Sequence, residues 1–267
     1  MWKCVCCGQT TLLDQVLNFM TCPKCGSILA TEGTPFKHQY LTDTCNINNY
    51  QTVIDACAGS GMLQFPNGEL KEGSPLILEK IMKDKGHCIC IEVDRKTHKL
   101  LKYFCKSAEV IHGDCNEVLP EIVDGKKPTL VYVDPFGYGV PVIDRRVVMK
   151  LSETPNTDLL IHFSWRICRE MGYARKYLKS ENVTLKKRAE SYSNSLNIWW
   201  GNSDWMNWGS MKKRGYAEKY ADPLRKSNTI DITAFGKGRG LSFYLMLATK
   251  FKVPRYGILK WMKPKNS

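Results

Sequence analysis

Four acidic residues in this chain stand where a ligand could be bound, because each follows a short apolar run. Asp55 follows TVI, Glu92 follows CICI, Asp114 follows VIHG and Asp134 follows VYV. Short apolar runs bounded by polar residues are typical of buried strands. The carboxyl ends of neighbouring parallel strands meet at one edge of a sheet, which is where such sheets bind ligands. We therefore expect these carboxylates to face a common site.

A glycine turn follows the first of these strand tips. The stretch VIDACAGSGM contains Asp55, Ala56, Gly59 and Gly61. Glycines allow the backbone to approach a ligand closely, and the carboxylate can orient its polar groups. A dinucleotide fingerprint would require a third glycine where the chain has Gln64, and no Gly-x-x-x-x-Gly-Lys-Ser/Thr loop is present. We therefore predict a nucleoside cofactor without a pyrophosphate, and S-adenosylmethionine is the candidate.

The next two strand tips are expected to hold the nucleoside. Glu92 is placed to bind the two ribose hydroxyls, and Asp94 is a second candidate two residues later. Asp114 could accept a hydrogen bond from an adenine amino group. Each of these residues taken alone is as readily a helix N-cap, so the prediction rests on their order along the chain.

The fourth strand ends in VDPFGY, which predicts a site for an amine. Proline lacks an N–H, so the strand cannot continue past Pro135. The Asp134 carboxylate and the Pro135 carbonyl could accept both hydrogens of a nucleobase amine and restore electron density to its nitrogen. Phe136 would stack on the base and Gly137 would leave room for it. The alternative is a capped turn at the end of a strand.

Residues 1–30 form a cysteine-rich head. Cys4-x-x-Cys7 and Cys22-x-x-Cys25 are each followed by glycine, which is the spacing of a Cys4 zinc ribbon. Cys6 could replace a ligand of the first pair. A closed site of this kind is structural, because it leaves no open position for a substrate. We predict a structural zinc ion in the head, which would serve as a scaffold or grip nucleic acid.

Seven apolar runs predict seven strands, at residues 52–57, 88–93, 108–112, 129–134, 158–164, 229–235 and 242–250. The first five alternate with segments in which apolar residues repeat at helical spacing. This alternation predicts a doubly wound α/β fold with a parallel sheet. The last two runs, separated by GKGRG, predict a hairpin. We expect one Rossmann-like domain over residues 35–267, with the zinc ribbon in front of it.

The composition favours a polyanionic partner. Lys and Arg number 39 against 26 Asp and Glu, which gives a net charge of +13. Such an excess is typical of proteins that bind nucleic acid, although a solubilising basic surface is the alternative. The sequence has no long apolar run and no apolar segment after the first basic residue. We therefore expect no membrane span, no secretory signal and a cytoplasmic location.

An insert over residues 166–228 mixes basic with aromatic residues. Its second half gathers Trp199, Trp200, Trp205 and Trp208 beside Lys212, Lys213 and Arg214. We predict that it overhangs the carboxyl edge of the sheet and contacts nucleic acid, since basic side chains neutralise phosphates and aromatic faces stack on bases. The alternative is that the tryptophans form the core of a helical subdomain. His162 and Trp165 are expected in the core.

The stretches KHQYL, VIDACAGSGM, GSPLI, VDPFG and LSFYLMLATK together resemble the three-Cys-motif partner protein family of class I S-adenosylmethionine-dependent methyltransferases. The resemblance implies a seven-stranded methyltransferase sheet and that cofactor. It also places Lys37 and His38 where related enzymes close over the methionine end of the cofactor. The DPFG form looks like the motif of tRNA guanine N2-dimethyltransferases, whereas adenine and cytosine amino-methyltransferases more often have a second proline where this chain has Phe136.

These patterns predict a methyltransferase that modifies an exocyclic amine of a base in nucleic acid. RNA, as tRNA or rRNA, is slightly favoured over DNA, and no obligate protein partner is implied. Two other functions stay open: a non-catalytic nucleic-acid-binding protein on the same fold, and a methyltransferase for a protein or a small molecule.

Overall fold

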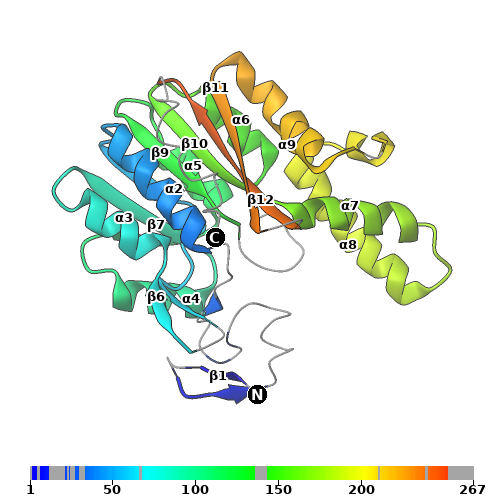
Figure 1. Ribbon diagram of the computed structural model, residues 1–267, viewed down its shortest axis with the longest axis horizontal. Coiled ribbons are helices and arrows are strands. Elements are labelled where there is room, and N and C mark those ends of the chain that lie inside the picture. The colour runs from blue at the N-terminus through cyan, green and yellow to red at the C-terminus, as the bar shows by residue number, and fades with distance from the viewer. Residues whose placement is uncertain are drawn as a thin grey trace, which may run out of the picture.

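A seven-stranded sheet forms the centre of the molecule (Figure 1). The structure is a computed structural model that describes residues 2–4, 7–11, 22, 24, 28–29, 34–65, 68–135, 143–209, 211–237 and 240–251. The strands are β4 (Thr52–Asp55), β7 (His87–Glu92), β8 (Glu109–His112), β9 (Thr129–Val133), β10 (Thr157–Ser164), β11 (Thr229–Lys237) and β12 (Gly240–Thr249). All seven lie within a few residues of their predicted positions.

The order of the strands is β11-β12-β10-β9-β4-β7-β8. The pairs β10–β9, β9–β4, β4–β7 and β7–β8 are parallel, and β12 runs antiparallel to both β10 and β11. This confirms the doubly wound α/β fold and the hairpin. The chain leaves β4 toward β7 on one side and returns to β9 on the other, so the strand order reverses beside β4. Ligands of open α/β sheets bind at such a point.

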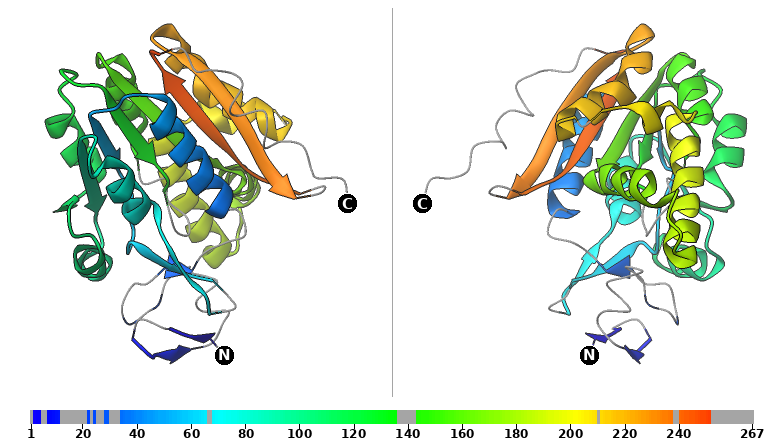
Figure 2. Two further views of the ribbon diagram at one scale, coloured as in Figure 1. Left: turned by 60° about the vertical axis from the view of Figure 1, so that its left-hand side comes forward. Right: turned by 90° about the vertical axis from the view of Figure 1, so that its right-hand side faces the viewer.

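Side chains of the sheet alternate between two helical layers, as the pleat of a strand requires. On β9, Leu130 and Tyr132 face one layer and Val131 and Val133 face the other. The first layer contains α2 (Thr34–Ile47), α3 (Ser74–Met82) and α4 (Arg95–Phe104), and the second contains α5 (Cys115–Ile122) and α6 (Arg145–Glu153). The two layers can be followed in Figure 2. Every residue of β9 is therefore buried.

The insert between β10 and β11 is helical and extends to one side of the sheet (Figure 1). It contains α7 (Trp165–Tyr177), α8 (Val183–Trp200), η1 (Asp204–Asn207), α9 (Lys213–Ala221) and η2 (Asp222–Lys226). Within the described part of the chain, no helix is both long and apolar enough to cross a membrane.

The tryptophans of the insert pack in its core. Trp199 and Trp205 have no exposed surface, and Trp200 is 7% exposed. The ring of Trp199 stacks on Tyr220 with centroids 4.6 Å apart and lies 6.1 Å from Phe163 of β10. The structure therefore favours the alternative, in which these three tryptophans form the core of a helical subdomain, and their contact with nucleic acid stays a prediction. Their burial joins the insert to the sheet.

The N-terminal head shares a small sheet with the main domain. β1 (Trp2–Lys3) pairs with β2 (Thr10–Thr11), while β3 (Ile28–Leu29) pairs with β5 (Met62–Gln64), which pairs with β6 (Leu70–Glu72). The Gln64 amide also donates a 2.8 Å hydrogen bond to the Lys3 carbonyl. The β5–β6 hairpin follows the glycine turn and did not emerge from the sequence pattern, because its strands are too short to show a period.

Candidate active site

Three adjacent strands bring Asp55, Glu92 and Asp134 to one edge of the sheet. β4 lies between β7 and β9, and each carboxylate ends or directly follows its strand. Asp114 follows β8, one strand further out. The strand order reverses at this edge, and open α/β sheets bind their ligands at such a point. The predicted carboxylates therefore lie where the sheet can bind a ligand.

Asp134 is held by three side chains. The Lys37 ammonium, from α2, and the Tyr132 hydroxyl both donate hydrogen bonds to Oδ2, the latter at 2.9 Å. His162 Nδ1, from β10, lies 2.7 Å from Oδ1 without meeting the geometry of a hydrogen bond. The carboxylate is therefore fixed from α2, from its own strand and from the neighbouring strand.

The surroundings of Asp134 keep it ionised. Burial alone would raise the pKa of this carboxyl, but Lys37 and His162 outweigh burial and hold the pKa well below its usual range. Burial lowers the pKa of His162, and burial together with the Lys37 charge lowers the pKa of His38 to about 4. Both shifts favour the neutral form of the imidazole.

Asp55 is fully buried next to the glycine turn. Its Oδ1 accepts a 3.3 Å hydrogen bond from the Cys57 amide, while Oδ2 is buried with no hydrogen-bond partner among the described residues. Burial raises the pKa of this carboxyl to about 7, a rise that the nearby Ser74 hydroxyl partly offsets. A buried acceptor without a partner is costly, and a ligand could reach Oδ2 only if the residues around it moved, because Asp55 has no exposed surface.

The glycine turn is tied to the end of β7. Gly59 and Gly61 have φ values of 66° and 79°, which side chains disfavour. The Gly59 amide donates to Glu92 Oε2 at 2.9 Å, and the Asp94 amide donates to Glu92 Oε1 at 2.8 Å. Burial raises the pKa of the Glu92 carboxyl. Glu92 thus occupies the place predicted for a ribose-binding carboxylate, with each oxygen accepting one backbone N–H.

Asp94 and Asp114 both cap helices. Asp94 Oδ1 accepts from the Thr97 amide and hydroxyl at 2.8 Å each, at the start of α4. Asp114 Oδ1 accepts from the Asn116 amide at 2.8 Å, at the start of α5. The structure therefore gives both residues an N-cap role, in addition to placing them at the predicted edge.

A small cavity lies among these residues. Its lining includes Lys37, His38, Gly59 and Asp134, and its volume of about 30 Å³ is that of one water molecule. The unpartnered Asp55 oxygen, the glycine turn and Glu92 fit a nucleoside cofactor in their chemistry. Because a nucleoside is far larger than the cavity, binding requires the side chains that line it to move.

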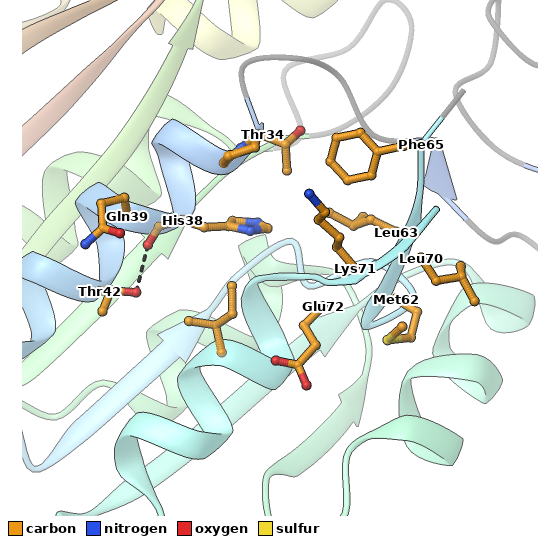
Figure 3. Close-up of a pocket in the computed structure, with 12 residues that line it drawn as sticks. Thr34, His38, Gln39, Thr42, Met62, Leu63, Phe65, Leu70, Lys71 and Glu72 are labelled. Carbon is orange, nitrogen blue, oxygen red and sulfur yellow. Dashed lines mark hydrogen bonds between the residues drawn. The ribbon is translucent and has the colours of Figure 1, made fainter. Parts of the chain in front are cut away.

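A larger cavity of about 470 Å³ adjoins the first, between α2 and the β5–β6 hairpin. Thr34, His38 and Leu63 line both cavities. Figure 3 shows His38 reaching from α2 into this space, with Phe65 and Lys71 across from it on the hairpin. The volume and the mixed apolar and polar lining are those of a small-molecule pocket.

The other residues predicted around Asp134 are partly described. Pro135 follows it directly, and the Ala56 amide donates a 2.9 Å hydrogen bond to the Tyr132 carbonyl between β4 and β9. Ala56 therefore uses its N–H within the sheet. Phe136 and Gly137 lie outside the described residues, as does the side chain of Trp165.

Three thiols gather in the head. The sulfur atoms of Cys4, Cys7 and Cys22 lie within 4.8 Å of one another, and those of Cys7 and Cys22 are 3.7 Å apart. Tetrahedral Zn²⁺ takes four such ligands, so the cluster fits three of the four predicted positions. Cys25 and the alternative Cys6 lie outside the described residues.

The basic residues of the insert stand at the start of α9. Lys212 and Arg214 are exposed, and Arg214 donates a 3.1 Å hydrogen bond to Glu218. Trp208 packs edge-on against Trp200, with centroids 4.7 Å apart. The basic side chains are thus accessible to a polyanion, whereas the neighbouring aromatic ring is engaged within the insert.

Sequence reasoning missed His162 and Tyr132 as site residues. His162 is partly buried, with 12% of its side chain exposed, and it contacts Asp134 as well as the ring of Phe243. Residues two apart on a strand share a face, so Tyr132 could have been placed beside Asp134. Ile161 is opposite Val133 in the β10–β9 register, which brings His162 next to Asp134. A histidine within an apolar strand next to the Asp-Pro strand was the available signal.

Comparison with solved structures shows the fold. The chain is similar to the protein LPL1258 from Legionella pneumophila, with a TM-score of 0.50 and 10% identity over 80% of this chain and 84% of that chain. It is also similar to the O-methyltransferase from Bacillus cereus in complex with SAH, with a TM-score of 0.44 and 12% identity over 81% of each chain. The plantazolicin methyltransferase BamL gives a TM-score of 0.46 and 9% identity over 80% of this chain and 84% of that chain.

The fold is the Rossmann-like fold of class I methyltransferases. Its sheet has seven strands, with the antiparallel β12 between β10 and β11 and the acidic strand tips at the carboxyl edge. The chain matches no protein-family model and no curated protein sequence.

Proposed function

We propose that the protein is an S-adenosylmethionine-dependent methyltransferase that modifies an exocyclic amine of a base in nucleic acid, with RNA favoured over DNA. One observation carries this proposal. Asp134 is a partly buried, ionised carboxylate at the carboxyl edge of a methyltransferase sheet, and it lines the same cavity as the glycine turn. A site of this kind can orient an amine beside a cofactor.

The chain offers a set of residues for the cofactor. S-adenosylmethionine, when bound, supplies a methyl group on a positively charged sulfur. Asp55, Gly59, Gly61 and Glu92 would hold it at the switch point of the sheet, with Asp94 and Asp114 as further acceptors and Lys37 at the methionine end. The buried Asp55 oxygen without a partner is the strongest single support for a polar ligand there.

Asp134 would orient the acceptor amine. A base amine is a weak nucleophile because its lone pair is delocalised into the ring. A carboxylate has about four lone-pair sites. Lys37 and Tyr132 donate to Oδ2, and His162 approaches Oδ1. Room therefore remains on Oδ1 for one amine hydrogen, while the Pro135 carbonyl would accept the other. Phe136 and Gly137 would stack on the base and leave room for it.

The net charge of +13 supports a nucleic-acid substrate. The exposed Lys212 and Arg214, with Lys213 between them, would contact phosphates at the edge of the insert. This excess of positive charge is consistent with a cytoplasmic enzyme that acts on tRNA or rRNA without an obligate protein partner.

The head would be a structural zinc ribbon over residues 1–30, in front of a methyltransferase domain over residues 35–267. Its support is the gathering of three thiols at mutual distances within 4.8 Å. With the resemblance to the three-Cys-motif partner protein family, the chain would be a ribbon-bearing relative of that family.

Transfer of labelled methyl groups tests the proposal. Purified protein is incubated with methyl-labelled S-adenosylmethionine and with total RNA or total DNA, and nucleosides are analysed after digestion. We expect label in an N-methylated nucleoside of RNA and none with Asp134→Ala. Cofactor binding is measured separately by calorimetry. Cofactor binding without label in either polymer overturns the nucleic-acid substrate, and absence of binding overturns the enzyme in favour of a non-catalytic nucleic-acid-binding protein.

The larger cavity favours a second candidate. Its volume of about 470 Å³ would enclose a small acceptor beside the cofactor site, which fits a small-molecule methyltransferase. The same assay with a metabolite extract in place of nucleic acid distinguishes this candidate, since label would then appear in a low-molecular-weight product.

A further inference from the structure

We propose that the larger cavity, between α2 and the β5–β6 hairpin, binds a nucleotide of the RNA substrate next to the one whose base is methylated. This inference rests on the proposed function and extends it to the recognition of the substrate. The larger cavity adjoins the one that Asp134 lines, because Thr34, His38 and Leu63 line both. An RNA strand with one base at Asp134 therefore has a neighbouring nucleotide within reach of the larger cavity.

One wall of this cavity is a face of α2. Thr34, His38 and Thr42 follow one another at intervals of four residues, so they share one face of the helix, and all three line the cavity. The His38 ring reaches into the space (Figure 3) and makes no hydrogen bond among the described residues, since only its backbone carbonyl accepts one, from Thr42 at 2.8 Å. Burial and the Lys37 charge lower the pKa of His38 to about 4, which favours a neutral ring with one N–H donor and one lone pair. Such a ring can bind the polar edge of a base.

The opposite wall is the β5–β6 hairpin, which offers an aromatic ring and a cation. Phe65 follows β5 and is half-buried, and Lys71 lies on β6 opposite Leu63. The Lys71 ammonium lies 5.0 Å from the centroid of the Phe65 ring. Phe65 and Lys71 lie across the cavity from His38 (Figure 3). Aromatic rings stack on bases and ammonium groups neutralise phosphates, so this pair fits a nucleotide better than an uncharged metabolite.

The present contacts of Lys71 are weak enough to be exchanged for a phosphate. Its ammonium lies 3.2 Å from the Glu69 carboxylate, and both side chains are 49% exposed. Exposed ion pairs of this kind contribute little to stability. A base that stacks on Phe65 would displace the ammonium from the ring, and the ammonium would then bind the phosphate of the same nucleotide. The cavity volume of about 470 Å³ is within the range of sites that enclose a ligand of this size.

Titration with mononucleotides tests the site directly. Protein labelled with ¹⁵N in its histidines is titrated with AMP, GMP, CMP and UMP, and with the matching nucleosides, in the presence of S-adenosylhomocysteine. The His38 signals are identified by their loss in His38→Gln. We expect saturable shifts of these signals with at least one nucleotide, and weaker binding of its nucleoside. Absence of shifts with all four nucleotides overturns the proposal, and so does competition between the nucleotide and S-adenosylhomocysteine.

Variants of the hairpin separate the contact with the base from the contact with the phosphate. We expect Phe65→Leu to raise the Kd of the nucleotide about fivefold or more, because stacking is lost, whereas Phe65→Tyr should keep the affinity. Lys71→Met should weaken binding of the nucleotide and leave that of the nucleoside nearly unchanged. Tyr103→Leu and Lys106→Met are the matched controls, because the Lys106 ammonium also lies 5.0 Å from the Tyr103 centroid but neither residue lines either cavity. Wild-type affinity for the nucleotide in Phe65→Leu or in Lys71→Met overturns the proposal.

Filter binding with total RNA identifies the source of the nucleotide. We expect Phe65→Leu to lower the affinity for RNA by a factor that is the same at two salt concentrations, because stacking releases no counterions. Unchanged RNA affinity in Phe65→Leu would mean that the cavity takes a free nucleotide, which overturns its assignment to the RNA substrate.

The two proposals fail separately. If the wild-type protein methylates neither RNA nor DNA, the proposed function is wrong, and the His38 titration and the filter binding still decide what the larger cavity binds. If no nucleotide shifts the His38 signals while RNA is methylated, the inference alone is wrong.

Discussion

The Gly59 amide donates its hydrogen bond to the Glu92 carboxylate, so the turn after β4 is fixed to the end of β7 by a side chain 33 positions away. The two residues that the sequence suggested for separate parts of a nucleoside cofactor are thus one structural unit. Glu92 fixes the glycine turn, and under the proposed function it would also bind the ribose of the cofactor. A substitution of Glu92 should therefore disturb the glycine turn as well as the end of β7.

We expect Glu92→Gln to weaken S-adenosylmethionine binding by at least about tenfold, since hydrogen bonds to a charged acceptor are worth about 1.5 to 3 kcal/mol. Isothermal titration calorimetry measures the effect. Glu109→Gln, at the exposed edge of β8, is the matched control and should bind as the wild-type does. Equal affinity in Glu92→Gln would show that this carboxylate does not bind the cofactor.

Loss of the Asp134 charge should destabilise the protein as well as inactivate it. Asp134→Asn leaves the Lys37 ammonium, whose side chain is 9% exposed, without its counter-charge. Removal of one partner of a buried pair costs about 3 to 5 kcal/mol. We expect a loss of this order in urea unfolding. The double variant Lys37→Met with Asp134→Asn should regain part of it, and a double variant no more stable than Asp134→Asn would contradict the pairing.

Stability should depend on pH through Asp55. Because its folded pKa is raised to about 7 from a usual value near 4, the folded state binds the extra proton between these two values. The contribution of Asp55 to the stability of the cofactor-free protein is therefore fully present below the lower value and is lost as the pH rises toward 7. Asp55→Asn should remove this fall and be more stable than the wild-type at pH 8 by a few kcal/mol. Asp124→Asn, at an exposed position, should keep the wild-type slope.

The thiol cluster should hold one metal ion per chain. We expect elemental analysis to find zinc in the wild-type protein and less than half as much in Cys22→Ser, because loss of one of four thiolates weakens a tetrahedral site. Cys168→Ala, on α7, provides the control and should retain the metal. Full zinc content in Cys22→Ser would exclude this cysteine as a ligand.

The buried aromatic residues and the exposed basic residues of the insert should affect different properties, namely stability and RNA binding. Trp199→Ala should cost about 3 to 5 kcal/mol of unfolding free energy through the cavity it leaves. Replacement of Lys212, Lys213 and Arg214 by alanine should leave stability nearly unchanged and reduce both RNA affinity and its dependence on salt. Urea unfolding and filter binding at two salt concentrations measure these effects. An unchanged salt dependence would remove the basic cluster from the interface.

The sequence predicted the sheet well because its strands carry strong local signals. The run of β9 is the clearest, because all five of its residues are buried, and the helices between the strands show their own period. The position of Asp55, Glu92 and Asp134 at one edge followed from the topology, since parallel strands end on the same side. No detailed side-chain information was needed for that part of the site.

The contacts between side chains could not be predicted from the sequence. Whether Trp199 stacks on a base or on Tyr220 depends on packing between the insert and β10, which no local pattern reveals. The ion pair of Lys37 with Asp134 joins residues 97 positions apart. An acidic residue that follows a strand can cap the next helix as well as face a ligand, and the sequence does not distinguish the two roles. Asp94 and Asp114 lie at the predicted edge and also cap α4 and α5.

The pairing of β3 with β5, together with the hydrogen bond from Gln64 to the Lys3 carbonyl, connects the thiol cluster to the strand that leaves the glycine turn. If a metal ion orders the head and a cofactor orders the turn, the two binding equilibria share one small sheet. Thermodynamic linkage is then reciprocal, so the metal changes the affinity for the cofactor by the same factor as the cofactor changes the affinity for the metal. Chelation would weaken cofactor binding, and saturation with cofactor would slow the loss of the metal.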